Sequence, residues 1–222
     1  MTRNFSPEAS SPATPPQMVG RIITARHGRP DVDRTVRISA REYGDWWANY
    51  DLAGLAPEES PPEALVKLAE NCDIVLSSSL PRAIETAQKI VKSSRDVPQD
   101  PVFVEAPLPA PPVPFLKLNP TRWGQISRTF WFLGYAPKGM EGHIHSWKRV
   151  KKVADQLISH AATGGDVLLC AHGYLNWMID EHIRRRGWVR VDHQGRNHYW
   201  SWRVYEQQSV DLQVVPTSEV AE

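Results

Sequence analysis

The sequence predicts an α/β fold of three layers, in which a mostly parallel sheet carries helices on both faces. Short apolar segments alternate with amphipathic ones, the pattern of strands joined by helices in a parallel sheet. Two apolar segments also end alike, since Arg21 to Ala25 runs into Arg26-His27-Gly28 and Asp166 to Ala171 runs into His172-Gly173. These residues are therefore expected at the carboxyl edge of the sheet, where α/β folds bind ligands.

The first half of the chain is predicted to supply three strands and two helices. Proline at position 30 keeps the first strand from continuing beyond the His-Gly pair. Apolar residues at helical spacing, Leu65, Leu68 and Ala69, indicate the first helix. The expected strands are Arg21 to Ala25, Asp73 to Ser77, and Val102 to Val104 ending at Glu105, and the expected helices are Pro61 to Asn71 and one that begins near Arg82.

The second half is predicted to complete the sheet. Trp147, Val150, Val153 and Leu157 recur at helical spacing, and a pair of glycines at 164 and 165 ends that helix. The expected elements are a helix from Glu141 to Ala161, a strand from Asp166 to Ala171, a helix that includes Leu175 to Ile179, and an aromatic strand from His198 to Tyr205.

The segment 106–140 has a different composition and is predicted to be a cap inserted over the carboxyl edge. It begins with closely spaced prolines and continues with the aromatic residues Trp123, Phe130, Trp131, Phe132 and Tyr135. Such insertions commonly select the substrate, so these aromatics are expected to form a wall that favours a substrate with an apolar or aromatic body. The alternative is that they pack the segment onto the main domain.

Length and composition favour one domain over residues 20–207, with a disordered tail at 1–19 and a C-terminal tail at 208–222. A chain of 222 residues with 41% hydrophobic content can bury one sizeable core. Cys72 and Cys170 lie in or beside apolar runs, which indicates buried thiols and a reducing compartment. No apolar run reaches membrane-spanning length, so a cytoplasmic protein is expected.

Charge and motif content narrow the classes of partner. The chain has 26 basic and 25 acidic residues, and its net charge of +1 argues against a nucleic-acid partner. His143 and His145 resemble a metal pair, but no cysteine or carboxylate stands at ligand spacing, so neither a metal nor a cofactor is predicted. The sequence does not predict the oligomeric state.

Five polar residues that follow strands are expected to meet at the carboxyl edge: Arg26, His27, Arg82, Glu105 and His172. Two guanidinium forks match the oxygens of a phosphoryl group, although most arginines form surface ion pairs. A neutral imidazole beside them can attack phosphorus, and a second can stabilise the developing charge. Glu105 is the candidate acid for the leaving oxygen, since a nearby phosphate dianion favours a protonated carboxyl.

With these residues the sequence resembles the histidine phosphatase superfamily, the phosphoglycerate mutase-like or branch 1 enzymes, from about Met18 to Tyr205. The matching parts stand in the family's order: Arg26-His27-Gly28, the Arg-Ala-x-x-Thr-Ala segment within Ser79 to Ala87, Glu105, and Ala171-His172-Gly173. The resemblance implies a phosphoglycerate mutase-like fold and a histidine-acid-type phosphatase that hydrolyses a phosphorylated small molecule. It also implies that His27 is the nucleophile, that Arg26, Arg82 and His172 bind the phosphate, and that Glu105 is the general acid and then the base.

The chain departs from the family at several positions, which leaves alternatives open. Pro30 and Asp33 stand where many members have a small hydroxyl residue and an asparagine, and a proline-containing stretch follows Glu105 in place of the glycine-bearing one of mutases. Asp31, Asp100 and Glu141 are alternative acids. The alternative functions are phosphoglycerate mutase-like phosphoryl transfer and a non-catalytic module that binds a phosphorylated ligand.

Overall fold

The computed structural model describes residues 18–92 and 94–208. These residues form a six-stranded sheet in the order β3-β2-β4-β1-β6-β5. The strands β1 (Ile22–Arg26), β2 (Ile74–Ser78), β3 (Gln99–Asp100) and β4 (Val167–Ala171) are parallel, whereas β6 (Trp202–Gln207) is antiparallel to both β1 and β5 (Trp188–Gln194). The predicted α/β class with a mostly parallel sheet is confirmed.

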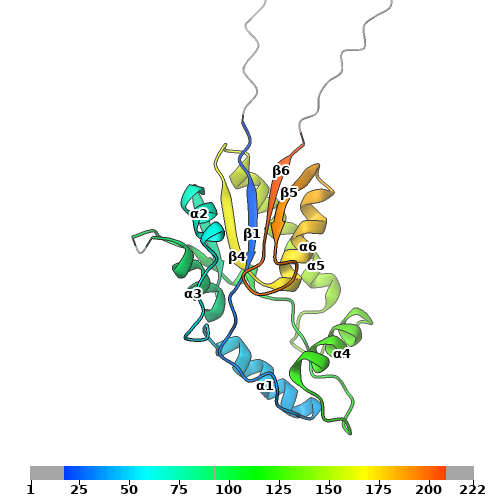
Figure 1. Ribbon diagram of the computed structural model, residues 1–222. Helices are drawn as coiled ribbons and strands as arrows, with labels where there is room; N and C mark the ends of the chain where they lie inside the picture. Colours follow the sequence, from blue (N-terminus) through cyan, green and yellow to red (C-terminus); the bar gives the residue numbers. More distant parts are fainter. Residues whose placement is uncertain (1–17, 93, 209–222) are drawn as a thin grey trace, which may run out of the picture.

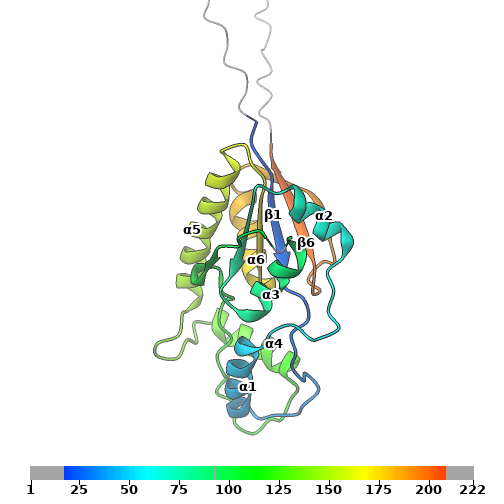
Figure 2. The same ribbon diagram turned by 90° about the vertical axis from the view of Figure 1, so that its left-hand side faces the viewer.

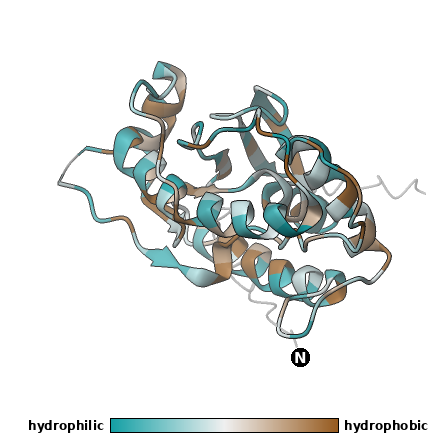
Figure 3. Ribbon diagram, turned by 90° about the horizontal axis from the view of Figure 1, so that it is seen from below, coloured by the Kyte–Doolittle hydropathy of each residue, from teal (hydrophilic) through white to brown (hydrophobic). Residues whose placement is uncertain are grey.

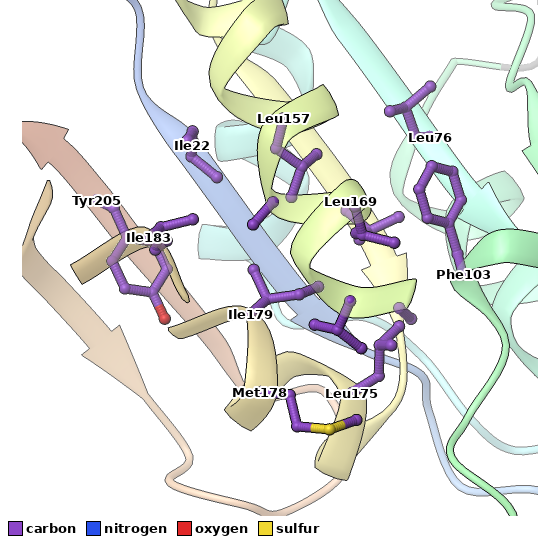
Figure 4. Close-up of a cluster of buried hydrophobic side chains, with 14 of the residues drawn as sticks. Ile22, Leu76, Phe103, Leu157, Leu169, Leu175, Met178, Ile179, Ile183 and Tyr205 are labelled. Carbon is purple, nitrogen blue, oxygen red and sulfur yellow. The ribbon is translucent and has the colours of Figure 1, made fainter. Parts of the chain in front are cut away.

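Helices cover both faces of the sheet (Figure 1). On one face lie α2 (Glu63–Asn71) and α3 (Pro81–Ile90), and on the other lie α5 (His143–Ala161) and α6 (Gly173–Arg184). Consecutive side chains of a strand point to opposite faces, so Ile22 packs with α5 and α6 while Ile23 packs with α2 and α3. Figure 4 shows the first of these cores, with Ile22 and Leu169 of the sheet facing Leu157 and Ile179.

Two further helices, α1 (Ala40–Leu52) and α4 (Pro120–Phe132), lie beyond the carboxyl end of β1 in both side views (Figures 1 and 2). They share a small apolar cluster that includes Tyr43 and Trp123, both fully buried. Figure 3 looks onto this end of the molecule and shows helical segments of mixed hydropathy around the strand ends. The segment 106–140 thus supplies one helix to this region, and the chain after β1 supplies the other.

Two predicted strands were wrong in part, and two helices and one strand were not predicted. The third strand lies at Gln99–Asp100 rather than 102–104, because the Asp100 carboxylate accepts the Val102 N–H at 2.8 Å and the chain enters a short 3₁₀ turn, Pro101–Phe103. The last strand begins at Trp202, and 198–201 belongs to the turn that connects it with β5. The elements that were not predicted are α1, α4 and β5.

The structure tests the predictions about the tails, membrane-spanning segments and cysteines only in part. The predicted tails fall outside the described residues except for residues 18, 19 and 208. Of the helices in the described part, none is long and apolar enough to cross a membrane. Cys72 and Cys170 are buried free thiols, and burial raises the pKa of the Cys72 thiol to about 12.

Candidate active site

A cavity of about 670 Å³ opens where α1, α4 and the start of α6 surround the end of β1. Its lining includes Arg26, His27, Arg82 and Glu105, four of the five residues expected at this edge. The fifth, His172, lies directly behind the lining, with its ring centroid 5.2 Å from that of His27. The structure therefore brings together all five residues that the sequence singles out.

His27 is buried and held in one tautomer. Its Nδ1 lies 2.7 Å from the Gly28 carbonyl oxygen, which can only accept, so the proton is on Nδ1 and the lone pair is on Nε2. Burial and the charges of Arg82, Arg26 and Arg34 lower the pKa of His27 well below its usual value. A neutral imidazole with a free Nε2 is the form that can act as a nucleophile.

Gly28 allows the turn that follows His27 to pack closely against the β5–β6 connection. A Cβ at position 28 would lie 2.4 Å from the Trp200 ring, so this position accepts no side chain. The Gly28 N–H donates to the Thr86 hydroxyl at 2.9 Å, and the His27 carbonyl accepts the Trp200 N–H at 3.3 Å. The backbone of the nucleophile candidate is therefore fixed from α3 and from the β5–β6 turn.

His172 is fully buried and makes one side-chain hydrogen bond, between its Nε2 and the Ser78 hydroxyl at 2.8 Å. The Ser78 hydroxyl also accepts the Leu80 N–H at 3.3 Å. When Ser78 donates its own proton to Nε2, the proton of the neutral ring lies on Nδ1. Burial, followed by the charges of Arg82, His27 and Arg26, lowers the pKa of His172 well below its usual value.

Arg82 is fully buried near the amino end of α3 and is oriented by α1. Its Nη1 donates to the Tyr50 carbonyl at 2.9 Å, and its Nη2 pairs with the Asp51 carboxylate at 3.0 Å. Its guanidinium lies 4.3 Å from the Tyr50 ring centroid. These contacts exclude the surface ion-pair alternative for Arg82.

Arg34 and Tyr199 belong to the same region, although the sequence did not single them out. The guanidinium of Arg34 lies 5.2 Å from the Tyr50 ring and 5.9 Å from the Tyr199 ring. Tyr199 also stacks on Arg26 at 4.7 Å and lies 5.7 Å from the His27 ring. Two tyrosine rings thus separate three guanidinium groups around His27.

Besides the Tyr174 hydroxyl of the cavity lining, five buried polar atoms around His27 have no hydrogen-bond partner within the described structure. They are Nε of Arg26, Nε of Arg34, Nε of Arg82, Nδ1 of His172 and the Tyr199 hydroxyl. Each can donate a proton, and buried donors are normally paired. Five donors without acceptors around one imidazole fit an anion with several oxygen atoms.

Glu105 lines the cavity and is fixed by backbone N–H groups. Its Oε1 accepts from Leu175 at 2.9 Å and from Ala106 at 3.0 Å, and its Oε2 accepts from Tyr174 at 3.1 Å. Two of these donors belong to the first turn of α6, where N–H groups lack partners within the helix. Although the third strand ends earlier in the chain than predicted, Glu105 still lines the cavity.

The three alternative acids do not line this cavity. Glu141 bonds to Arg149 at 2.9 Å and to the Ser146 hydroxyl at 2.6 Å, and Asp100 caps the 3₁₀ turn. Asp31 is exposed. Within the described chain, no group of three His, Cys, Asp or Glu side chains is arranged to hold a metal ion.

The predicted aromatic wall was wrong for Trp123 and Trp131. Both are fully buried, and their indole N–H groups donate to backbone oxygens, of Ile38 at 2.7 Å and of Glu141 at 3.0 Å, respectively. The packing alternative holds for these two residues, and Tyr135 is also absent from the lining. Of the predicted wall, Phe132 does line the cavity, and the other aromatic rings of the lining are those of Trp47, Tyr50, Tyr174 and Trp177.

The comparison with known families agrees with the site. A family model of the histidine phosphatase superfamily (branch 1) matches residues 22–216. The chain belongs to this superfamily. No curated protein matches the sequence.

Several solved structures share this fold at low sequence identity. A mycobacterial glucosyl-3-phosphoglycerate phosphatase is 18% identical with a TM-score of 0.54, covering 85% of this chain and 97% of that one. A phosphoglycerate mutase from Bacillus anthracis is 18% identical with a TM-score of 0.54, covering 87% and 93%. The ecdysone phosphate phosphatase of Bombix mori is 14% identical with a TM-score of 0.51, covering 86% and 92%. These matches support the phosphoglycerate mutase-like fold.

Proposed function

We propose that the protein is a phosphomonoesterase that works through a phosphohistidine on His27. The observation that carries this proposal is the set of five buried, unpartnered donors beside a neutral imidazole. A phosphoryl group would supply the missing acceptors, and charge-assisted bonds from arginines suit the charge of the transition state.

The reaction has two balanced steps. His27 Nε2 attacks phosphorus while the bond from phosphorus to the leaving oxygen breaks, and Glu105 gives its proton to that oxygen. Glu105 then takes a proton from water as the water oxygen attacks phosphorus, which breaks the P–N bond and releases inorganic phosphate and neutral His27. Arg26, Arg82 and His172 bind the phosphoryl oxygens in both steps, and Arg34 and Tyr199 add two further donors.

The test is release of inorganic phosphate from p-nitrophenyl phosphate, together with rapid-quench labelling from a ³²P-labelled substrate. The wild type should release phosphate and carry acid-labile, alkali-stable label, and His27→Ala should lose both. His145→Ala is the matched control, because His145 is exposed on α5 outside the cavity, and it should behave as the wild type.

Three outcomes would contradict parts of this proposal. Equal labelling of the wild type and His27→Ala would exclude His27 as the nucleophile. Release of p-nitrophenol without inorganic phosphate, with the phosphoryl group recovered on an added acceptor alcohol, would indicate a mutase, and binding of phosphate without turnover would indicate a binding module. The cytoplasmic location expected from the sequence stays a prediction.

A further inference from the structure

The position of Glu105 indicates where the alcohol part of a substrate must lie, if the proposed function is correct. The group that protonates the leaving oxygen has to be within hydrogen-bond reach of it. Glu105 is bound by the N–H groups of Tyr174 and Leu175 at the start of α6. The body of the leaving alcohol therefore extends past Tyr174, away from His27.

The surface beyond Tyr174 is aromatic and partly open to solvent. The ring of Tyr174 lies 5.9 Å from that of Phe132 and 5.1 Å from that of Trp177. Phe132 and Trp177 keep 45% and 37% of their surface exposed. Exposed aromatic residues grouped at the rim of a cavity are typical of a binding surface.

The cavity lining contains four arginines, and each of them already has contacts within the protein. Arg26, Arg34 and Arg82 surround His27 and lower its pKa, so they belong to the phosphoryl end. Arg128 donates to the carbonyls of Ala106 and Pro107 and lies 4.0 Å from the Tyr174 ring. No arginine or lysine of the lining is thus left over for a second anionic group on the alcohol.

The cavity is also long enough for a large alcohol. Residues of α4 from Thr121 to Phe132 line it along one side. At a rise of 1.5 Å per residue this face extends over about 16 Å. Trp47 and Tyr50 of α1 also belong to the lining, so aromatic surface comes from α1, α4 and α6.

We propose that Phe132, Tyr174 and Trp177 form a subsite for the leaving alcohol, and that the substrate is the phosphomonoester of an uncharged alcohol with a flat aromatic or fused-ring body. The ring system stacks on Trp177 and Tyr174, and the edge of Phe132 borders it. Substrate choice therefore depends on three rings beside the general acid, and the phosphoryl end makes the same contacts with every phosphomonoester.

The experiment compares 2-naphthylmethyl phosphate with ethyl phosphate, because both release a primary alcohol and differ mainly in the size of the apolar body. The wild type should have the higher kcat/KM for 2-naphthylmethyl phosphate. Trp177→Ala should reduce the ratio of the two kcat/KM values about 10-fold, which corresponds to about 1.4 kcal/mol. Trp177→Phe should retain most of the ratio, because it keeps an aromatic face.

Leu133→Ala is the control, since Leu133 follows Phe132 but is 80% exposed and outside the lining, and it should leave both kcat/KM values unchanged. A wild type without preference, or a Trp177→Ala variant that loses activity equally on both substrates, would overturn the subsite while leaving the phosphatase function intact. Absence of phosphate release from either substrate and from p-nitrophenyl phosphate would overturn the proposed function itself.

Discussion

Replacement of Glu105 by glutamine separates the proton-donating role of this residue from its structural role. The carboxylate accepts three backbone N–H groups, from Ala106, Tyr174 and Leu175. Glutamine keeps one oxygen, which can still accept from Ala106 and Leu175 at the Oε1 position. Its NH₂ group, however, faces the Tyr174 N–H and cannot accept from it.

Two effects of different size follow from this geometry. An unpaired Tyr174 N–H costs about 1–3 kcal/mol, a cost in stability that affects every substrate equally. Loss of general acid catalysis costs about 10²- to 10⁴-fold in rate, but only where the leaving oxygen needs a proton. The rate with p-nitrophenyl phosphate should therefore fall modestly, and the rate with ethyl phosphate should fall by a further factor of about 10² or more.

The assay is kcat/KM for both substrates in the wild type, Glu105→Gln and Glu141→Gln. Glu141 is a matched control because it is a hydrogen-bonded carboxylate that pairs with Arg149 and lies outside the main cavity. Glu141→Gln should leave the ratio of the two substrates unchanged. An equal loss on both substrates in Glu105→Gln would refute the assignment, and a changed ratio in Glu141→Gln would move the acid to that residue.

Three further predictions concern the buried charges and the core. Arg82→Ala should weaken competitive inhibition by inorganic phosphate about 10- to 150-fold, because a charge-assisted hydrogen bond contributes about 1.5–3 kcal/mol; an unchanged inhibition constant would place Arg82 outside the phosphate site. Folding lowers the pKa values of His27 and His172, so near and below the unfolded-state pKa of 6.5 the unfolded chain binds more protons than the folded protein. The free energy of unfolding should therefore fall by about 1 kcal/mol per histidine as the pH drops from 7 to 5.5. Urea unfolding at both pH values measures this change, which should be about 1 kcal/mol smaller in His27→Gln than in the wild type. An equal change in both proteins would contradict the prediction. Trp131→Ala should lower the free energy of unfolding by about 3–5 kcal/mol without changing the ratio of the kcat/KM values for 2-naphthylmethyl and ethyl phosphate. A changed ratio with unchanged stability would indicate that Trp131 contacts the substrate.

The sequence was informative where one local pattern determines both an element and its position. The runs that end at His27 and His172 are buried β1 and β4, which are adjacent and parallel in the sheet, with Arg26 paired to Ala171. Two parallel neighbours necessarily bring the residues after them to one edge. For this reason the pairing of the two histidines could be predicted without any knowledge of the loops.

The missed features differ in their local signals, which were clear for α1 and weak for β5 and Arg34. The helix α1 begins with a capping box, in which the Ser39 and Glu42 side chains bond to each other's backbone N–H groups, and that signal was available in the sequence. Its aromatic residues Tyr43, Trp46, Trp47 and Tyr50 also stand at helical spacing on one face, so the periodicity was available in the sequence as well. The edge strand β5 is exposed along nearly its whole length, so it lacks the apolar pattern of a buried strand. Arg34 lies in a loop, and contacts with Trp46, Tyr50 and Tyr199 from distant parts of the chain bring it to the site.

The aromatic residues of α4 show why composition could not decide between packing and substrate contact. Trp131 and Phe132 are adjacent, yet the first is fully buried and the second is 45% exposed at the cavity, because successive helical residues are rotated by about 100°. The buried residues Trp123, Ser127 and Trp131 recur every four positions and form one face of the helix. Thr121, Gln125 and Phe132 form the other. A count of aromatics in the segment cannot distinguish these faces, whereas the helical register can, and it assigns the cavity-facing ring to Phe132.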